Sequence, residues 1–164
     1  MASDGVETTT NQIGPFVSYA NSYRTLALKA CGWETDVKMI EERIQALVTS
    51  GQYEKAAGIA LFQTGNLLHT VHVLNSSQDE RLQLVATALA SCANNPSFVQ
   101  PMWQKMCMNL SLDMKDPYIR SMFGLIASGG DWNVVLGEKG LSLCDRIGVA
   151  LRFLNDEDVR LSIQ

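Results

Sequence analysis

Long apolar runs are missing from this sequence. No charge-free stretch reaches the roughly 18 residues that a membrane-spanning helix needs. The first residues, MASDGVETTT, also lack the basic and apolar regions of a secretory signal. These two features together predict a cytoplasmic protein.

Charged residues are also scarce, and basic residues do not outnumber acidic ones. Charged residues make up only 18% of the 164 residues, hydrophobic residues make up 46%, and the formal net charge is −4. Without a basic field or a run of Lys and Arg, the sequence predicts no binding to nucleic acid. A low content of charged residues together with a high content of apolar residues predicts that other proteins, or a second copy of the chain, cover part of the surface.

Cysteine and histidine lack the spacings of a metal site. The four cysteines, at positions 31, 92, 107 and 144, include no Cys-x-x-Cys pair, and each stands in an apolar pattern. We interpret them as buried reduced thiols. His69 and His72 lie three residues apart, but no further pair of ligands follows at a recognised spacing. We therefore expect no metal and no cofactor.

Motifs of nucleophilic catalysis and phosphate binding are also absent. The chain has no Gly-x-Ser-x-Gly turn and no Gly-x-x-x-x-Gly-Lys-[Ser/Thr] loop. Its acidic clusters, Glu41-Glu42 and Asp156–Asp158, stand on a predicted solvated helix face and at a predicted helix start, where carboxylates are common for structural reasons. The sequence thus predicts a protein that is not an enzyme and has no catalytic residue.

Apolar residues at steps of three and four are what the sequence does contain. They predict about nine to ten helices, separated by Gly stops and by starts such as Asp116-Pro117. We expect helices over residues 16–30, 35–50, 53–63, 66–74, 77–94, 97–110, 117–129, 131–136, 141–154 and from 156 onward.

The links between these segments are short, about two to six residues, which makes consecutive helices antiparallel neighbours. The expected fold is therefore all-α: an α-solenoid of antiparallel helical hairpins over residues 15–164, after a disordered leader at residues 1–14. A closed, irregular helical bundle is the alternative. Because Val159, Leu161 and Ile163 begin an apolar pattern without a stop signal, we also expect the solenoid to be cut short at its C-terminal end.

Three tryptophans are candidates for core or interface. We assign Trp33 and Trp103 to packing between hairpins. Trp132 follows a Gly-Gly-Asp corner, and Tyr118 stands in the first turn of the helix that begins at Pro117. Since aromatic side chains often anchor interfaces, Trp132 and Tyr118 are the predicted partner-binding residues.

Several strings, taken in order, resemble the helical region of the Mios (missing-oocyte) family of WD-repeat proteins, scaffold subunits of the GATOR (SEA) complex. The resemblance runs from about residue 23 to the end, without the β-propeller and the zinc-binding RING-like module that flank this region in the family. The strings are YR-x-LAL and CGW within 23–33, A-x-x-ALF and VLN within 57–75, LVA-x-AL at 84–89, W-x-x-MC at 103–107, DPY and MF within 116–123, and DRI and FL within 145–154.

This resemblance implies a non-catalytic scaffold that holds other protein subunits together, including a small β-propeller. It also implies a role in relaying amino-acid availability to the TOR kinase complex, at the lysosomal or vacuolar surface, with the membrane reached only through the complex. Two alternatives stay open from the residues alone. One is an α-solenoid of a vesicle coat or tethering complex, and the other is a small helical ligand-binding protein or enzyme with its site between helices.

Overall fold

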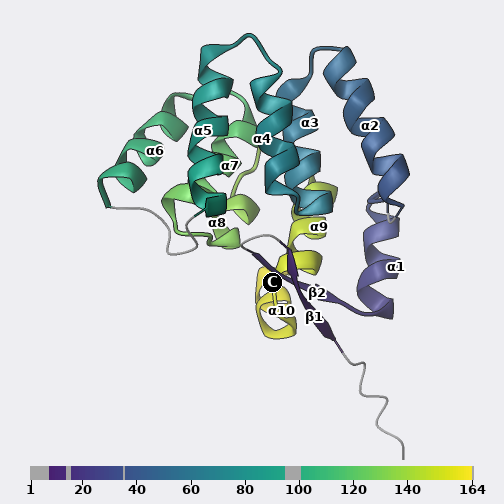
Figure 1. Ribbon diagram of the computed structural model, residues 1–164. Helices are drawn as coiled ribbons and strands as arrows, with labels where there is room; N and C mark the ends of the chain where they lie inside the picture. The colour runs from purple at the N-terminus through teal and green to yellow at the C-terminus, as the bar shows by residue number, and fades with distance from the viewer. Residues whose placement is uncertain (1–7, 14–15, 35, 95–100, 164) are drawn as a thin grey trace, which may run out of the picture.

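The computed structural model describes residues 8–13, 16–34, 36–94 and 101–163. In these ranges it has ten α-helices, one π-helical turn and a two-stranded sheet (Figure 1). The elements are β1 (Thr9–Ile13), β2 (Phe16–Ala20), α1 (Ser22–Ala30), α2 (Val37–Thr49), α3 (Tyr53–Ile59), η1 (Ala60–Thr64), α4 (Leu67–Asn75), α5 (Glu80–Asn94), α6 (Pro101–Asp113), α7 (Pro117–Ala127), α8 (Trp132–Leu136), α9 (Leu143–Phe153) and α10 (Asp156–Ile163).

Helix starts and stops follow the polar and glycine signals of the sequence. The Asp116 carboxylate accepts hydrogen bonds from the first backbone N–H groups of α7, and Pro117 takes the first helical position. Gly51 follows α2 with a φ of 78°, in the left-handed region that favours glycine. Side-chain caps of the same kind stand before five other helices, at Asn21, Asp36, Asn66, Asp131 and Ser142.

Consecutive helices pack on one another, as the predicted solenoid requires. The helices α2 to α5 form one run of neighbours and α6 to α10 form another, and α7 joins the two runs by packing on both α3 and α5. Since six consecutive residues of α7, Ser121 to Ile126, are buried, this helix is the centre of the core. The prediction of an all-α solenoid built from antiparallel hairpins is confirmed.

The N-terminal segment forms a β-hairpin, which differs from the structure predicted from the sequence. Strands β1 and β2 pair antiparallel, with Thr9 opposite Ala20 and Ile13 opposite Phe16. The predicted disorder is therefore wrong for Thr9–Ile13, and the predicted helix is wrong for Phe16–Ala20. Phe16 and Ser18 are buried while Val17 between them is exposed, which is the two-residue alternation of a strand. Residues 1–7 and 14–15 lie outside the described residues.

The hairpin also places α1 beside α9, an element near the other end of the chain. Strand β2 and helix α1 both pack on α9, so residues near 20 and near 150 lie side by side. In Figure 1 the two strands cross below α9, and α6 lies at the opposite side of the molecule from α1 and α2. The hairpin and α1 thus cover one side of α9, which in an open stack would face solvent.

Several apolar side chains that stand at the three- and four-residue steps of the predicted helices are exposed instead of buried. They are Tyr23 and Leu26 on α1, Met102 on α6 and Leu143 on α9. The expected burial of the thiols is confirmed for Cys107. Cys31 is half-buried and Cys144 is exposed, so burial is wrong for Cys144. The side chains of Cys92 and Trp103 lie outside the described residues.

Candidate protein-interaction site

Trp132, one of the two predicted partner-binding residues, belongs to the core. Its ring is stacked on Phe153 of α9 with centroids 3.9 Å apart and planes 6° apart. The edges of Phe16 and Phe62 complete the cluster, at centroid distances of 4.9 and 6.1 Å from Trp132. Only 6% of Trp132 is exposed, since the indole joins α8, α9, β2 and η1, and binding of a partner by Trp132 stays a prediction.

Tyr118, the other predicted residue, is half-buried in the first turn of α7. Its hydroxyl donates a hydrogen bond of 2.9 Å to Oδ2 of Asp145 on α9. Burial, followed by the nearby Asp145 carboxylate, raises the pKa of this hydroxyl. The ring lies so close to Gly58 of α3 that a Cβ there would stand 2.4 Å from Cδ1 of Tyr118. Tyr118 thus ties α7 to α3 and α9, and its remaining exposed edge leaves partner binding as a prediction.

The Tyr118 hydroxyl is expected to contribute to stability even in the absence of a partner. Replacing Tyr118 by Phe should lower the free energy of unfolding by about 1 kcal/mol, because the half-buried carboxylate of Asp145 loses a hydrogen-bond donor. Urea unfolding followed by circular dichroism measures the change. Tyr23→Phe is the matched control, since Tyr23 is exposed; equal effects of the two substitutions would contradict a stabilising bond to Asp145.

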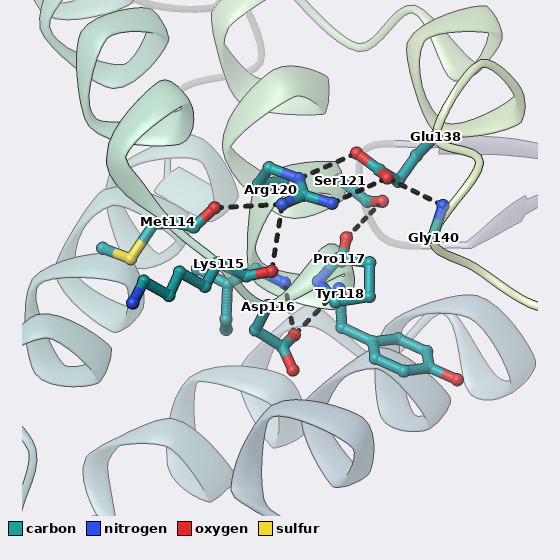
Figure 2. A network of polar contacts seen from close by, with 10 residues as sticks. Met114, Lys115, Asp116, Pro117, Tyr118, Arg120, Ser121, Glu138 and Gly140 are labelled. Atoms are coloured by element: carbon teal, nitrogen blue, oxygen red, sulfur yellow. Dashed lines mark hydrogen bonds and ion pairs between the residues drawn. The ribbon is translucent and has the colours of Figure 1, made fainter.

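A second polar network connects the segment before α7 to the link between α8 and α9 (Figure 2). The Arg120 guanidinium donates through Nε and Nη2 to both carboxylate oxygens of Glu138, at 3.0 and 2.9 Å. Its Nη1 donates to the backbone carbonyls of Met114 and Lys115. Glu138 also accepts a hydrogen bond from the backbone N–H of Gly140. One arginine on α7 therefore holds both the segment before it and the link between α8 and α9.

This network makes stability depend on pH. The hydrogen bonds from Arg120 hold the pKa of Glu138 below its ordinary value of 4.5. Since the folded pKa is the lower one, the stabilisation is complete above the pKa of the unfolded chain and disappears as the pH falls through the folded pKa. Arg120→Met should cost about 1–3 kcal/mol at pH 7 and flatten the loss of stability below pH 5.

Urea unfolding at several pH values measures both effects of the Arg120 substitution. Arg81→Met on the exposed face of α5 is the control and should leave the pH profile unchanged. An Arg120→Met variant with the wild-type profile would show that Glu138 does not contribute to acid sensitivity.

Helix α6 carries the most exposed apolar side chains of the described chain. Met102 is 80% exposed and Leu112 76% exposed, with Met106 and Met108 also on the surface. At 3.6 residues per turn these four side chains cover roughly half of the helix circumference, and we call them the α6 ridge. Methionine side chains adapt to varied partners, and exposed apolar patches mark interaction sites. The ridge is therefore the best candidate for a protein-binding surface.

The histidines and acids form no metal centre in the described ranges. The Nδ1 atom of His69 lies 3.1 Å from Oε1 of Glu41, and His72 is exposed on the next turn of α4. Among the residues whose positions the structure gives, no group of three or more His, Cys, Asp or Glu side chains could hold a metal ion. The nearest polar neighbour given for the His69 ring is therefore the Glu41 carboxylate.

None of the helices that the structure describes has both the length and the apolar character needed to cross a bilayer.

Comparison with known proteins supports the solenoid architecture and gives it a family. The family model described as "MIOS, alpha-solenoid" matches residues 2–153. SEH-associated protein 4 of Saccharomyces cerevisiae is 39% identical over 137 residues, which cover 83% of this chain and 13% of that protein. The GATOR2 complex protein MIOS of Danio rerio is 35% identical over 144 residues, covering 81% and 16%. The GATOR2 complex protein Mio of Drosophila melanogaster is 26% identical over 150 residues, covering 89% and 17%. The chain thus spans less than a fifth of the length of these relatives.

Proposed function

Because this chain belongs to the MIOS α-solenoid family, we propose that it is a non-catalytic scaffold segment that helps to assemble a GATOR (SEA) complex. The match to the family model over residues 2–153 carries this proposal, and relatives named as GATOR2 complex proteins support it. The α6 ridge supports it physically, since an assembly can bury the apolar side chains that this chain leaves exposed.

The finer parts of the proposal follow from the family resemblance. The scaffold joins other subunits, including a small β-propeller, and one relative bears the name SEH-associated protein. Through the assembled complex, the protein helps to relay amino-acid availability to the TOR kinase complex at the lysosomal or vacuolar surface. Contact with the membrane is then made by the complex and not by a helix of this chain.

Affinity capture tests this assignment. A tagged full-length protein containing this chain is captured from cells, and its partners are identified by mass spectrometry. We expect other GATOR subunits, among them a small β-propeller. Capture of vesicle-coat or tethering subunits without any GATOR subunit would overturn the assignment in favour of the other scaffold class.

The α6 ridge gives a sharper prediction within the same experiment. The double substitution Met102→Glu and Leu112→Glu should reduce the capture of at least one subunit about tenfold or more, because charge at the centre of an apolar contact costs 1.4 kcal/mol or more. The free energy of unfolding should change by no more than about 0.5 kcal/mol, since both side chains are on the surface.

A matched control separates the ridge from the general effect of added negative charge. Leu26→Glu and Leu68→Glu change apolar residues of α1 and α4 that are 69% and 70% exposed, and they should leave capture unaltered. If the ridge variant captures every subunit as the unmodified protein does, α6 is not the binding surface, although the family assignment would still hold.

A further inference from the structure

A cavity of about 490 Å³ lies between β2, α1, α2, the η1–α4 corner and α9. Small-molecule sites in proteins commonly have volumes of about 300–1,000 Å³, with mostly apolar walls and a few convergent polar groups. This cavity has such a volume and mixed walls: Leu28, Trp33 and Ile40 form apolar wall, while Arg24, Gln63 and Arg152 bring polar groups. We call it the Arg152 cavity.

Two residues that line the Arg152 cavity each have a buried polar atom without a partner within the described residues. These atoms are Oε1 of Gln63, a residue only 3% exposed, and Nε of Arg152. Buried polar atoms are nearly always hydrogen-bonded, and leaving them without a partner costs free energy. One of the two atoms is an acceptor and the other is a donor. A molecule that satisfies both must therefore offer an acceptor and an N–H or O–H donor.

Arg152 also has no counter-ion among the residues that the structure describes. Its Nη1 donates to the backbone carbonyl of Gln63, and burial lowers the pKa of its guanidinium. None of the ion pairs among the described residues includes Arg152. Arg24, which lines the same cavity, is different because its Nη2 lies 2.6 Å from Oδ1 of Asp156. The unneutralised positive charge at the cavity therefore belongs to Arg152.

The charge of the lining limits what this cavity can take. Glu34 and Glu41 also line it, so a doubly charged anion such as phosphate would meet about twice the repulsion that a single carboxylate meets. A carboxylate is also the planar acceptor that a guanidinium binds best.

We propose that the Arg152 cavity binds a small monocarboxylate that carries a neighbouring N–H donor. On binding, the buried Arg152 and Gln63 side chains turn toward the cavity, so that the carboxylate accepts a hydrogen bond from Nε of Arg152 and the N–H donates to Oε1 of Gln63. The apolar part of the molecule lies against Trp33 and Ile40. The same chemistry is present in a free acid and at the C-terminal residue of a peptide. This site is separate from the α6 ridge, and its test does not depend on the scaffold role.

Nuclear magnetic resonance on the ¹⁵N-labelled 164-residue chain tests the proposal. The probe is N-acetylglycine, and the signals are the Nε–H groups of Arg152 and the indole N–H of Trp33, assigned from single substitutions. We expect saturable shifts of both signals, with a dissociation constant of about 1 mM or tighter. N-acetylglycine methyl ester, which lacks the charge, and acetate, which lacks the N–H, should each bind at least tenfold more weakly.

A longer probe distinguishes the two sources of the carboxylate. If N-acetyl-tetraglycine binds as tightly as N-acetylglycine, the natural ligand is a peptide C-terminus. If it binds tenfold more weakly, the natural ligand is a free small acid. If neither acid shifts the Arg152 and Trp33 signals at about 10 mM in low salt, the proposal is overturned.

Substitution of Gln63 gives an independent test. Gln63→Glu places a carboxylate of the protein itself beside Arg152, so it should abolish N-acetylglycine binding while keeping or raising the melting temperature. Arg152→Met should weaken binding at least tenfold, and Arg160→Met, on the exposed face of α10, should not change it. If Arg152→Met does not fold, the folded Gln63→Glu variant decides alone: unchanged binding in that variant overturns the proposal.

Discussion

Replacing Trp132 by alanine is expected to lower the free energy of unfolding by about 3–5 kcal/mol, the usual cost of emptying a buried aromatic site. The ring lies flat on Phe153 and meets the edges of Phe16 and Phe62. These four rings come from segments distant in the sequence, and none of the three neighbours can fill the space without leaving its own contacts. The loss should therefore be close to the full cost of a cavity.

Urea unfolding of the 164-residue chain measures this loss, with the midpoint and the slope recorded separately. Tyr23→Ala is the matched control, because it removes an aromatic side chain that is 66% exposed and should change stability by no more than about 0.5 kcal/mol. An unaltered stability of Trp132→Ala, together with reduced capture of a partner subunit, would mean that the indole binds a partner after all.

Helix boundaries could be predicted because their signals are local. Asp116-Pro117 and Asp131 cap the helices they precede, and Gly51 follows the helix that it ends, as the sequence predicted. Each of these effects acts over one turn of chain, so a single sequence contains all the information that it needs. The antiparallel arrangement of neighbours follows equally directly from the short links.

The N-terminal hairpin could not be predicted in the same way. The strand Phe16–Ala20 has only five residues, and spacing of apolar residues over so short a segment also fits a helix that continues into α1. What decides for a strand is a distant contact, because β2 packs on α9, more than a hundred residues later. Tertiary contact of this kind overrides the local preference of the chain.

Burial could not be predicted where the sequence does not show what covers an apolar stripe of a helix. Met102 and Met106 have the spacing of a buried face, yet both lie on the α6 ridge. An amphipathic pattern states only that a face avoids water. The fold and the assembly decide whether a helix of the same chain or another protein covers that face. The low content of charged residues was the only sequence signal that another protein covers it.

The polar groups of the Arg152 cavity gave no sequence signal at all. Gln63 and Arg152 are 89 residues apart, and neither belongs to a recognised motif. Trp132, by contrast, was singled out because aromatic residues near turns often bind partners, but the fold places it between β2, η1 and α9. Residue type alone thus predicted which side chains make extensive contacts, and the fold determines which of these side chains are exposed to solvent.

Gly148→Ala is expected to lower the free energy of unfolding by about 3 kcal/mol, at the upper end of the cost of overpacking a core. Gly148 lies in α9 directly beneath the indole of Trp33, and a Cβ there would stand 2.2 Å from Cε2 and 2.4 Å from Cζ2 of that ring. The indole cannot move away freely, because its Nε1 donates to Asp145 at 3.3 Å. The rigid ring and the bond to Asp145 make this clash costly, although alanine favours the helix by about 1 kcal/mol relative to glycine.

Two further variants show whether the contact with Trp33 causes the loss. Gly137→Ala is the matched control: a Cβ at Gly137 comes no closer than 3.5 Å to the neighbouring backbone, so urea unfolding should show no loss beyond about 0.5 kcal/mol. Trp33→Leu should destabilise the chain by itself, but Gly148→Ala added to it should cost about 1 kcal/mol or less, because the smaller side chain leaves room for the methyl group. If the two costs simply add, the methyl group at position 148 clashes with something other than Trp33, and the close packing of the Trp33 loop on α9 is not what requires glycine there.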